Sequence, residues 1–427
     1  MGDIAVLGAG YVGLTTAICL ASLEHSVIVS DINEERIVNL GSGKCPIFEE
    51  SLEELLNQCL ESSRIRFTSN NCEAVSDADF VFLCLPTPQG EFGEADMQHV
   101  FRVIDEIRTT LRSGAIVITK STVPIGASAE VSSRIGRNDV FYVSNPEFLR
   151  EGTAVYDFLN PDRIVIGSTS EDAASRVGML YSRVSAPIIY TDPISAETIK
   201  YASNSFLATK LSFVNGLASV CEAVGANAGE VLRGMGMDSR IGGSYLRPGP
   251  GWGGSCFPKD TRALLATSDM KGFDFDLLRS VIVANDRHIN RIAEKLDSLV
   301  DRGAVERHIA ILGLTFKAGT DDLRDSPAVA IAVRLTQLGN NVSAFDPAVS
   351  DLRSLRLASE IQLRSSPEEA VRGASLVAIL TEWPEFQHLD PNSIGAVMNR
   401  RVVFDSRLIL AQWEWESAGF TYFGVGK

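Results

Sequence analysis

The sequence lacks the features of several protein classes. Its 427 residues include seven scattered cysteines, with no C-x-x-C pair, and five histidines. No His-x-x-x-His pair and no D-x-D-x-D-G loop occurs, so we expect no bound metal. An odd number of dispersed cysteines also argues against a disulfide framework and fits a reducing cytoplasm.

Long apolar runs and an excess of positive charge are missing as well. No run approaches the roughly eighteen apolar residues of a membrane helix, and the start of the sequence resembles no signal peptide. Lys and Arg number 39 against 54 Asp and Glu, a formal net charge of −15. This balance argues against nucleic-acid and anionic-membrane partners. The length allows two or three globular domains.

The first motif lies near the N-terminal end. A strand-like run at residues 4–8 leads into Gly8-Ala-Gly10-Tyr-Val-Gly13 and a helix-like segment, and a second strand-like run ends at Asp31. The glycines allow a tight turn against a pyrophosphate, and the helix N-terminus supplies N–H donors. Asp31 follows Gly13 by 18 residues, which suits the ribose of NAD and would repel the 2′-phosphate of NADP. We expect dinucleotide binding; the alternative is a glycine-rich turn without a ligand.

Strand-like runs recur in both halves of the chain. In the first half they continue at residues 80–85, 115–119, 141–144 and 163–167, where we expect parallel strands with functional groups beyond their C-terminal ends. In the second half, similar runs fall at residues 309–313, 342–346, 374–380 and 401–405. The fold class predicted is α/β, with two Rossmann-like doubly wound parallel-sheet domains. The first turn of the second half carries Lys317 and Arg324, which suit a phosphate ligand or are solvated surface charges.

The segment between the two halves has a helical pattern. Residues 197–224 show the apolar periodicity of one long amphipathic helix, which is either core or the backbone of a homodimer. We therefore expect three domains: a Rossmann domain at 1–194, a central helical dimerisation domain at 195–301 and a Rossmann-like domain at 302–427.

Several polar groups have the spacing of an active site. Glu147 and Glu151 are four residues apart, so their carboxylates would share a face if the segment forms a helical turn. Lys200 and Asn204 have the same spacing in the long helix and together could hold an oxyanion. Taken alone, each pair is more simply explained by a solvated surface, and Cys256 in GGSCFPKD by a small buried residue.

A glycine- and proline-rich loop follows Arg240 and leads straight to Cys256, Lys259 and Asp260. It has no regular periodicity. Such loops are either mobile surface or covers over a ligand.

Taken together, these motifs are similar to those of the UDP-glucose 6-dehydrogenase family. The similarity extends in order from Ile4 to about Leu410, through GAGYVGL, TPQ, STVP, NPEFLREGTAVYDFLNPDRIVIG, KYASNSFLATK, GMDSRIG, GWGGSCFPKD, LGLTFKAGTDDLRDSP and FDSR. The DFLNPDRIVIG segment resembles the UDP-glucose branch rather than the GDP-mannose branch. The resemblance implies that the C-terminal domain binds a nucleotide sugar and that the central domain carries the catalytic cysteine.

The resemblance implies a four-electron oxidation of UDP-glucose to UDP-glucuronate, in which two NAD+ are reduced in succession. Cys256 would capture the C6 aldehyde as a thiohemiacetal, and the second oxidation would give a thioester that water hydrolyses. A thiolate suits this route because hydride leaves only from a tetrahedral adduct. Other substrates stay open, namely TDP-glucose, GDP-mannose or a UDP-N-acetylhexosamine. A two-electron hydroxyacid dehydrogenase and an inactive NAD-binding regulator are further alternatives.

The resemblance also implies roles for individual residues. The catalytic set is Cys256 as nucleophile, Lys200 and Asn204 at the oxyanion, Asp260 positioning a water or base, Glu147 as general base and Thr122 holding the water. The cofactor set is Gly8, Gly10, Tyr11, Val12, Gly13, Asp31, Arg36, Thr87, Ser121, Thr122, Glu151 and Arg324. The substrate set is Glu147, Phe148, Leu149, Glu151, Lys200, Asn204, Arg240, Tyr245, Gly253, Phe316, Lys317 and Arg407. Arg240 is implied to reach the neighbouring subunit's site in a homodimer.

One departure from the family pattern is Gly216. Relatives often carry an acid after Asn215, and here the position is glycine. A glycine inside a helix costs about 1 kcal/mol relative to alanine. Its lack of a side chain suits a close contact between helices.

Overall fold

The computed structural model describes residues 2–90, 93–300, 307–353 and 360–427. It divides the chain into two compact units, Met1–Ser203 with Arg262–Phe273, and Asn204–Thr261 with Asp274–Lys427. The domain boundary expected between residues 301 and 302 lies outside the described residues. None of the helices in the described part of the chain combines the length and hydropathy needed to cross a bilayer.

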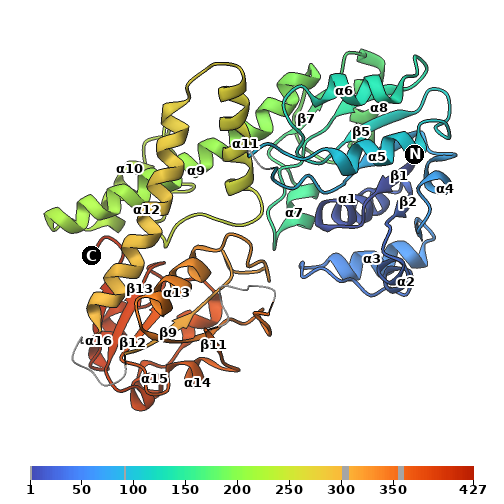
Figure 1. Ribbon diagram of the computed structural model, residues 1–427. Helices are drawn as coiled ribbons and strands as arrows, with labels where there is room; N and C mark the ends of the chain where they lie inside the picture. The colour runs from blue at the N-terminus through green and yellow to red at the C-terminus, as the bar shows by residue number, and fades with distance from the viewer. Residues whose placement is uncertain (1, 91–92, 301–306, 354–359) are drawn as a thin grey trace. The chain divides into compact units, whose positions relative to one another are not determined.

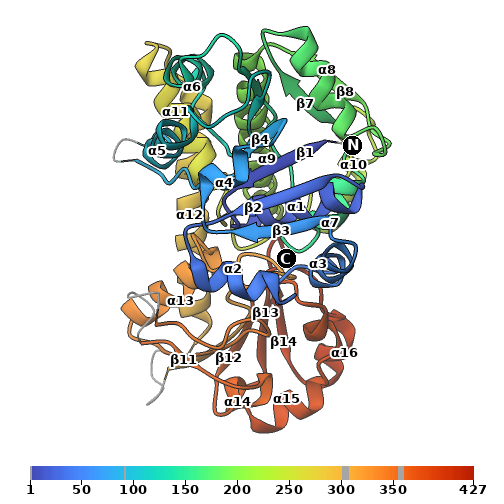
Figure 2. The same ribbon diagram turned by 90° about the vertical axis from the view of Figure 1, so that its right-hand side faces the viewer.

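The first unit is built on an eight-stranded sheet in the order β3-β2-β1-β4-β5-β6-β7-β8 (Figure 2). The strands are β1 (Asp3–Leu7), β2 (Ser26–Ser30), β3 (Ile65–Thr68), β4 (Phe80–Leu83), β5 (Ile116–Thr119), β6 (Phe141–Ser144), β7 (Ile164–Gly167) and β8 (Ile188–Thr191). From β3 to β6 all neighbours are parallel, which confirms the doubly wound topology predicted from the glycine motif and the repeated strands.

The expectation that residues 163–167 continue the parallel set is wrong. Strand β7 pairs antiparallel with β6 through Ser144 and Gly167, and β8 is parallel to β7. The segment between β6 and β7 contains one short helix, α7 (Ala154–Leu159). A turn and a half of helix is too short to return the chain to the edge of the sheet where β6 begins. Strand β7 therefore starts near the edge where β6 ends and runs in the opposite direction.

Successive side chains of β1 point to opposite faces of the sheet, so this unit has one hydrophobic core on each face. Ile4 and Val6 face a cluster that includes residues of α1 (Tyr11–Ser22), α3 (Leu52–Glu61), α7 and α8 (Glu171–Leu180). Ala5 and Leu7 face the other cluster, formed with α4 (Asn71–Val75), α5 (Gln98–Ile107) and α6 (Ala127–Ile135). The sheet is therefore covered on both faces, as parallel strands require.

The second unit contains a six-stranded parallel sheet in the order β11-β10-β9-β12-β13-β14. Its strands are β9 (His308–Leu312), β10 (Asn341–Phe345), β11 (Gln362–Leu363), β12 (Leu376–Ile379), β13 (Val402–Asp405) and β14 (Thr421–Gly424). This order repeats that of the first six strands of the other sheet. The similarity of the two halves in sequence therefore reflects two sheets with the same winding.

Helices of the central segment contribute to the core of the second unit. The long helix α9 (Pro193–Val224) confirms the prediction for residues 197–224 and begins four residues earlier, at a proline that suits a first helical turn. Its C-terminal part and α12 (Asp276–Leu299) pack with α13 (Pro327–Gln337) on one face of the sheet. The opposite face is covered by α14 (Pro367–Val371), η2 (Pro384–His388), α15 (Pro391–Val397) and α16 (Gln412–Ser417).

Two shorter elements complete the central segment, α10 (Ala228–Gly236) and α11 (Phe257–Met270), and the loop between them is irregular, as expected. Figure 1 shows α9 and α12 crossing side by side. Gly216 lies in α9, and no atom stands within 4 Å of the place where a Cβ would be. The glycine therefore makes no close helix contact within the described chain.

A buried carboxylate holds the start of α6 in the first unit. Glu197 of α9 accepts hydrogen bonds from the backbone N–H groups of Gly126, at 2.6 Å, and Ser128, at 3.1 Å. Burial raises the pKa of Glu197 to about 7, and these backbone hydrogen bonds oppose the rise without cancelling it.

The raised pKa of Glu197 predicts a pH-dependent contribution to stability. In the folded state the pKa is raised from 4.5 to about 7, so the proton stabilises the fold fully below the unfolded value. This contribution is lost as the pH rises through the folded value, and it amounts to roughly 3 kcal/mol at most. In Glu197→Gln it should be absent. Calorimetric melting temperatures from pH 5 to 8 should therefore fall more steeply in the wild type than in the variant. Parallel curves, or the same difference in the exposed-site control Glu171→Gln, would contradict this assignment.

Candidate active site

The glycine turn after β1 leaves room for a ligand at the start of α1. Gly8 has a positive φ of 99°, a conformation that favours glycine. A methyl group on Gly13 would come within 1.9 Å of the carbonyl oxygen of Gly8, so helix and turn pack too closely for any side chain. Beside Gly10, which precedes the first residue of α1, the space is open. Free N–H groups and an open approach fit a dinucleotide pyrophosphate.

Asp31 lies directly after β2, beside this turn. Its Oδ2 accepts a hydrogen bond of 2.8 Å from the backbone N–H of Ala9, and its Oδ1 accepts one of 2.9 Å from Asn33. Arg36 Nη1 is 3.3 Å from Oδ2. The carboxylate is thus fixed next to the glycine turn, where it can accept ribose hydroxyls, and the residues fit NAD.

Other members of the predicted cofactor set lie at the same edge of the sheet. Thr87 follows β4 and donates a hydrogen bond of 2.8 Å to the carbonyl of Thr122, which follows β5. Ser121 donates to the carbonyl of Leu85 at 2.7 Å. Val12 packs against the core, and Glu151 is half-buried. The loops after β4 and β5 are therefore tied together beside the glycine turn.

Tyr11 belongs to a small hydrogen-bond network that also contains Glu49, a residue that the sequence analysis did not single out. Its hydroxyl donates to the carboxylate of Glu49 and accepts a hydrogen bond of 3.1 Å from Gly152 N. Glu49 also accepts from the backbone N–H groups of Gly152, at 2.8 Å, and Ala154, at 2.7 Å. Burial and the bond to Glu49 raise the pKa of Tyr11 above its usual range. Glu49 lies in an irregular segment, so no spacing pattern indicated it.

Glu147 and Lys200 form a buried ion pair in the first unit. Lys200 Nζ is 2.8 Å from Glu147 Oε1 and 2.7 Å from the carbonyl oxygen of the same residue. Burial by itself would raise the pKa of Glu147, but the charge and hydrogen bond of Lys200 outweigh it and lower that pKa. Phe148, the next residue, has the Arg163 guanidinium 3.6 Å from its ring centre. Glu147 is therefore held ionised, with its partner fixed by α9.

The condition under which Glu147 and Glu151 would share a helical face is not met. Residues 145–150 are not helical. Glu147 Oε2 accepts a hydrogen bond of 2.6 Å from the backbone N–H of Leu149, two residues on. Such a local side-chain bond stabilises a turn in place of a helix, so the spacing of the two acids carries no periodic meaning.

Lys120 is a buried cation that sequence reasoning did not assign. It follows β5, is 6% exposed, and donates a hydrogen bond of 3.1 Å to Asn145 Oδ1. The Tyr181 hydroxyl donates to the same oxygen at 2.6 Å. Burial lowers the pKa of Lys120 to about 8, and the charge of Glu147 opposes this shift. Lys120 follows a buried strand directly, at the start of KSTVP, and this position in the sequence could have indicated that the side chain is buried near the site.

In the second unit, a fully buried carboxylate organises the segment around Cys256. Asp260 Oδ2 accepts a hydrogen bond of 2.6 Å from Asn204 Nδ2, and Oδ1 is 2.5 Å from Lys259 Nζ. Cys256 is half-buried and immediately precedes α11, and its carbonyl accepts a 2.8 Å bond from Asp260 N. The thiol thus lies at a helix N-terminus, where a partial positive charge favours an anion.

The turn before Cys256 packs tightly on the loop that follows β9. Gly254 N donates to the carbonyl of Arg324 at 3.1 Å, and a methyl group on Gly253 would be 1.9 Å from the carbonyl oxygen of Asp325. Gly254 has a φ of +81°, and a methyl group there would meet the ring of Phe316 at 2.8 Å. Only glycine fits at either position, so the GGSC turn is fixed by backbone contact.

The other residues of the predicted substrate set within this unit lie in three places. Arg407 follows β13 and donates hydrogen bonds to the carbonyls of Leu380, at 3.0 Å, and Phe316, at 3.2 Å. Lys317 is half-buried, with Nζ 5.6 Å from the Phe316 ring centre. Tyr245 has a φ of +61°, a strained value for a non-glycine residue. Arg240 is 87% exposed and pairs with Asp238 at 2.6 Å.

All seven cysteines lie among the described residues, and all are free thiols. Within the same residues, no group of three or more His, Cys, Asp or Glu side chains has the arrangement of a metal site.

Comparison with known proteins assigns the chain to a family. Three models of the UDP-glucose/GDP-mannose dehydrogenase family match it in order: the NAD binding domain at residues 2–185, the central domain at 194–287 and the UDP binding domain at 310–412. The UDP-glucose 6-dehydrogenase TuaD of Bacillus subtilis is 39% identical, over 100% of this chain and 94% of its own. The UDP-glucose 6-dehydrogenase of Rhizobium meliloti is 40% identical, over 99% of both chains.

Solved structures agree with this assignment. A UDP-glucose dehydrogenase from Pyrobaculum islandicum matches with a TM-score of 0.90 and 35% identity, over 100% of this chain and 98% of the other. A UDP-D-ManNAc dehydrogenase from Pyrococcus horikoshii matches with a TM-score of 0.87 and 29% identity, over 99% of each chain. The glycine turn, the buried acids and the cysteine at the start of α11 all lie within the matched segments. The chain therefore belongs to the UDP-glucose/GDP-mannose dehydrogenase family.

Proposed function

We propose that the protein oxidises the C6 hydroxymethyl group of UDP-glucose to a carboxylate, in two steps and with Cys256 as nucleophile. The observation that carries this proposal is the position of Cys256 at the start of α11, one turn before the buried Asp260. An enzyme that stopped at the aldehyde would not need a thiol there. Two relatives of 39% and 40% identity that are named UDP-glucose 6-dehydrogenases support UDP-glucose as the substrate. One solved structure of 29% identity is a UDP-D-ManNAc dehydrogenase, which keeps another sugar open.

Bound NAD supplies the hydride acceptor for both oxidations, one molecule for each. The C6 alcohol first loses a hydride and a proton to become an aldehyde. The Cys256 thiolate then adds to the aldehyde carbon, and the resulting thiohemiacetal loses a second hydride and a proton to become a thioester. Water attacks the thioester carbon, the C–S bond breaks, and the carboxylate leaves with the thiol regenerated. One alcohol and one water thus give a carboxylate and two reduced cofactors.

The Glu147–Lys200 pair supplies the charges that these steps need. Lys200 carries the cation that stabilises a developing oxyanion at C6. Its bond of 2.8 Å to Glu147 keeps the acid ionised, so Glu147 can accept the proton of the hydrolytic water. Thr122 orients that water. A charged pair held in place before the substrate arrives requires little rearrangement during the reaction.

Asn204 adds a neutral donor to the same task. Lys200 and Asn204 are four residues apart in the continuous helix α9, and side chains with this spacing share one helical face. Asp260 fixes the amide of Asn204 through the bond of 2.6 Å. We therefore assign Asn204 to the oxyanion and Asp260 to positioning, with Lys259 balancing its charge.

The C-terminal module is proposed to hold the nucleotide part of the substrate. Lys317 and Arg407 provide cationic donors for phosphate, and Phe316 and Tyr245 provide ring surfaces beside them. We retain the three functional segments, 1–194 for NAD, 195–301 for the cysteine and for dimerisation, and 302–427 for the nucleotide sugar. The free thiols fit a reducing cytoplasm.

The number of NADH formed per nucleotide sugar tests the reaction directly. With UDP-glucose we expect two NADH per sugar, because both oxidation steps occur on one substrate. In Cys256→Ser turnover should fall by at least about a thousandfold, since a serine hydroxyl without an adjacent base is a poor nucleophile. Cys221→Ser, a buried thiol of α9, is the matched control.

Each outcome of this experiment has a distinct meaning. One NADH per sugar, or full activity of Cys256→Ser, would refute the thioester route. Two NADH from TDP-glucose, GDP-mannose or UDP-N-acetylglucosamine alone would retain the route and change the substrate.

Mixing two inactive variants tests whether Arg240 completes a neighbouring site in a homodimer. Arg240→Ala retains Cys256, and Cys256→Ser retains Arg240, so a mixed dimer has one complete site. After subunit exchange we expect about a quarter of wild-type activity from an equal mixture. An absence of recovery in a mixture shown to contain mixed dimers would place Arg240 outside the neighbour's site.

A further inference from the structure

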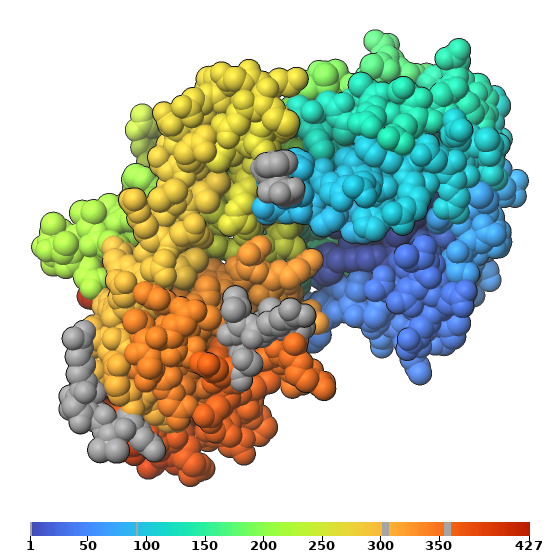
Figure 3. Space-filling view, in the orientation of Figure 1, coloured from blue at the N-terminus to red at the C-terminus, as the bar shows by residue number. Residues whose placement is uncertain are grey.

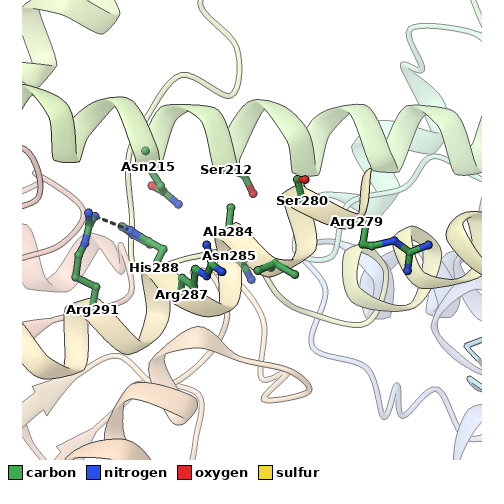
Figure 4. Close-up of a pocket in the computed structure, with 11 residues that line it drawn as sticks. Ser212, Asn215, Arg279, Ser280, Ala284, Asn285, Arg287, His288 and Arg291 are labelled. Atoms are coloured by element: carbon green, nitrogen blue, oxygen red, sulfur yellow. Dashed lines mark hydrogen bonds between the residues drawn. The ribbon is translucent and has the colours of Figure 1, made fainter. Parts of the chain in front are cut away.

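A pocket of about 460 Å³ lies between α9 and α12 in the second unit (Figure 4). None of its eleven lining residues is acidic, and three are arginines: Arg279, Arg287 and Arg291. This composition contrasts with the net charge of −15 of the whole chain. The volume falls within the usual range of small-ligand sites. A pocket with this charge selects an anion.

Two of the three guanidinium groups of the pocket lack a carboxylate partner among the described residues, whereas the third, Arg279, pairs with Asp274 at 3.6 Å. Neither Arg287 nor Arg291 pairs with a carboxylate among the described residues, and the two lie one turn apart on α12. Like charges at this spacing destabilise a helix by a few tenths of a kcal/mol. Arg291 donates instead to the Ser219 hydroxyl and to His288 Nδ1. The arrangement leaves planar donors available, and these match phosphate oxygens.

A buried amide points into the same space. Asn215 is 3% exposed, and its Oδ1 accepts a hydrogen bond of 2.9 Å from Gly249 N. Its Nδ2 donates to no group in the described part of the chain, and the side chain faces α12 in Figure 4. This nitrogen is not among the described buried polar atoms that lack a partner, so it is accessible from the pocket. An acceptor in the pocket would satisfy this donor.

The walls of the pocket also hold the loop that leads to Cys256. His288 Nε2 bonds to the carbonyl of Gly249 at 2.7 Å, so both backbone groups of Gly249 are held by pocket residues. Asn285 bonds to the N–H of Trp252 at 2.9 Å and to its carbonyl at 3.0 Å. The Trp252 indole N–H donates to Ser212 Oγ at 2.8 Å. Four lining side chains therefore fix residues 249–252, four residues before the nucleophile.

His288 connects a ligand on the arginines with this loop. Burial lowers its pKa to about 4, so the ring is neutral near pH 7. Since Nδ1 accepts from Arg291, Nε2 carries the proton and donates to Gly249. A ligand that moves Arg291 therefore acts on the hydrogen bond that positions the loop.

We propose that the pocket between α9 and α12 is a regulatory site for a small phosphate-bearing anion, whose binding shifts the loop 249–256 and with it Cys256. The regulatory part rests on the proposed function of Cys256, whereas binding does not. The site is separate from the glycine turn and from Lys317 and Arg407. Its ligand is recognised by guanidinium pairs and one amide rather than by a helix N-terminus.

Inorganic pyrophosphate is the probe for binding. Titration calorimetry on the full chain, saturated with NAD and at fixed ionic strength, should show a saturable site. Arg287→Gln and Arg291→Gln should each weaken binding by at least about tenfold, because one charge-assisted contact is lost. Arg353→Gln is the matched control, since Arg353 is 91% exposed and lies away from the pocket.

A second pair of variants tests the pocket without removing an arginine. The space beside Gly216 is open, so Gly216→Asp places a carboxylate at the pocket and Gly216→Asn places its neutral isostere there. Pyrophosphate binding should be lost with Asp and retained with Asn. Equal binding in all variants would overturn the proposal. A change of sedimentation with Gly216→Asp alone would do so too, because the pocket would then be an interface between copies of the chain.

The regulatory part has its own measurement. Pyrophosphate should change kcat or KM for the nucleotide sugar at least about twofold in the wild type and in Gly216→Asn, and not in Gly216→Asp. Binding without any kinetic effect would refute regulation and leave the anion site. If no nucleotide sugar is oxidised at all, the proposed function fails while the calorimetry still decides the site.

Discussion

The carboxylate of Asp260 is completely buried, and a buried charge has to be paired. Lys259 and Asn204 satisfy its two oxygens. Both partners are thereby fixed, one beside the thiol at the start of α11 and one on α9. The pair of Glu147 and Lys200 obeys the same rule in the other unit. In each cluster the requirement to compensate a buried carboxylate positions a donor of the proposed active site, so the fold and the proposed chemistry depend on the same contacts.

The sequence predicted the features that depend on short-range geometry. The glycine spacing, the strand runs and the long helix follow from turn sterics and periodicity, and the structure confirms them. The spacing of Glu147 and Glu151 could not decide whether the two acids share a face, because this depends on a hydrogen bond between Glu147 and a backbone group two residues away. The predicted direction of β7 was wrong, because the direction of a strand depends on the length of the helix that connects it to the preceding strand.

Long-range partners could not be read from the sequence. Glu49 contacts Tyr11 across 38 residues and Gly152 across 103, and His288 contacts Gly249 across 39. No local pattern encodes such pairs, since their only requirement is that each buried polar group finds a partner after folding. Motif similarity supplied the catalytic candidates, which stay predictions, whereas the residues that hold those candidates in place became visible through their hydrogen bonds.

The proline-rich loop before Cys256 illustrates how such support tolerates sequence change. Prolines 248 and 250 lack an N–H donor, and the bonds that hold the loop use the backbone groups of Gly249 and Trp252 instead. The prolines therefore cost no hydrogen bond, and they restrict the unfolded chain. Because the supporting side chains come from α9 and α12, the loop can vary while its anchor points stay fixed. The prolines of the loop are thus compatible with firmly held anchor points at Gly249 and Trp252, the second of which lies four residues before Cys256.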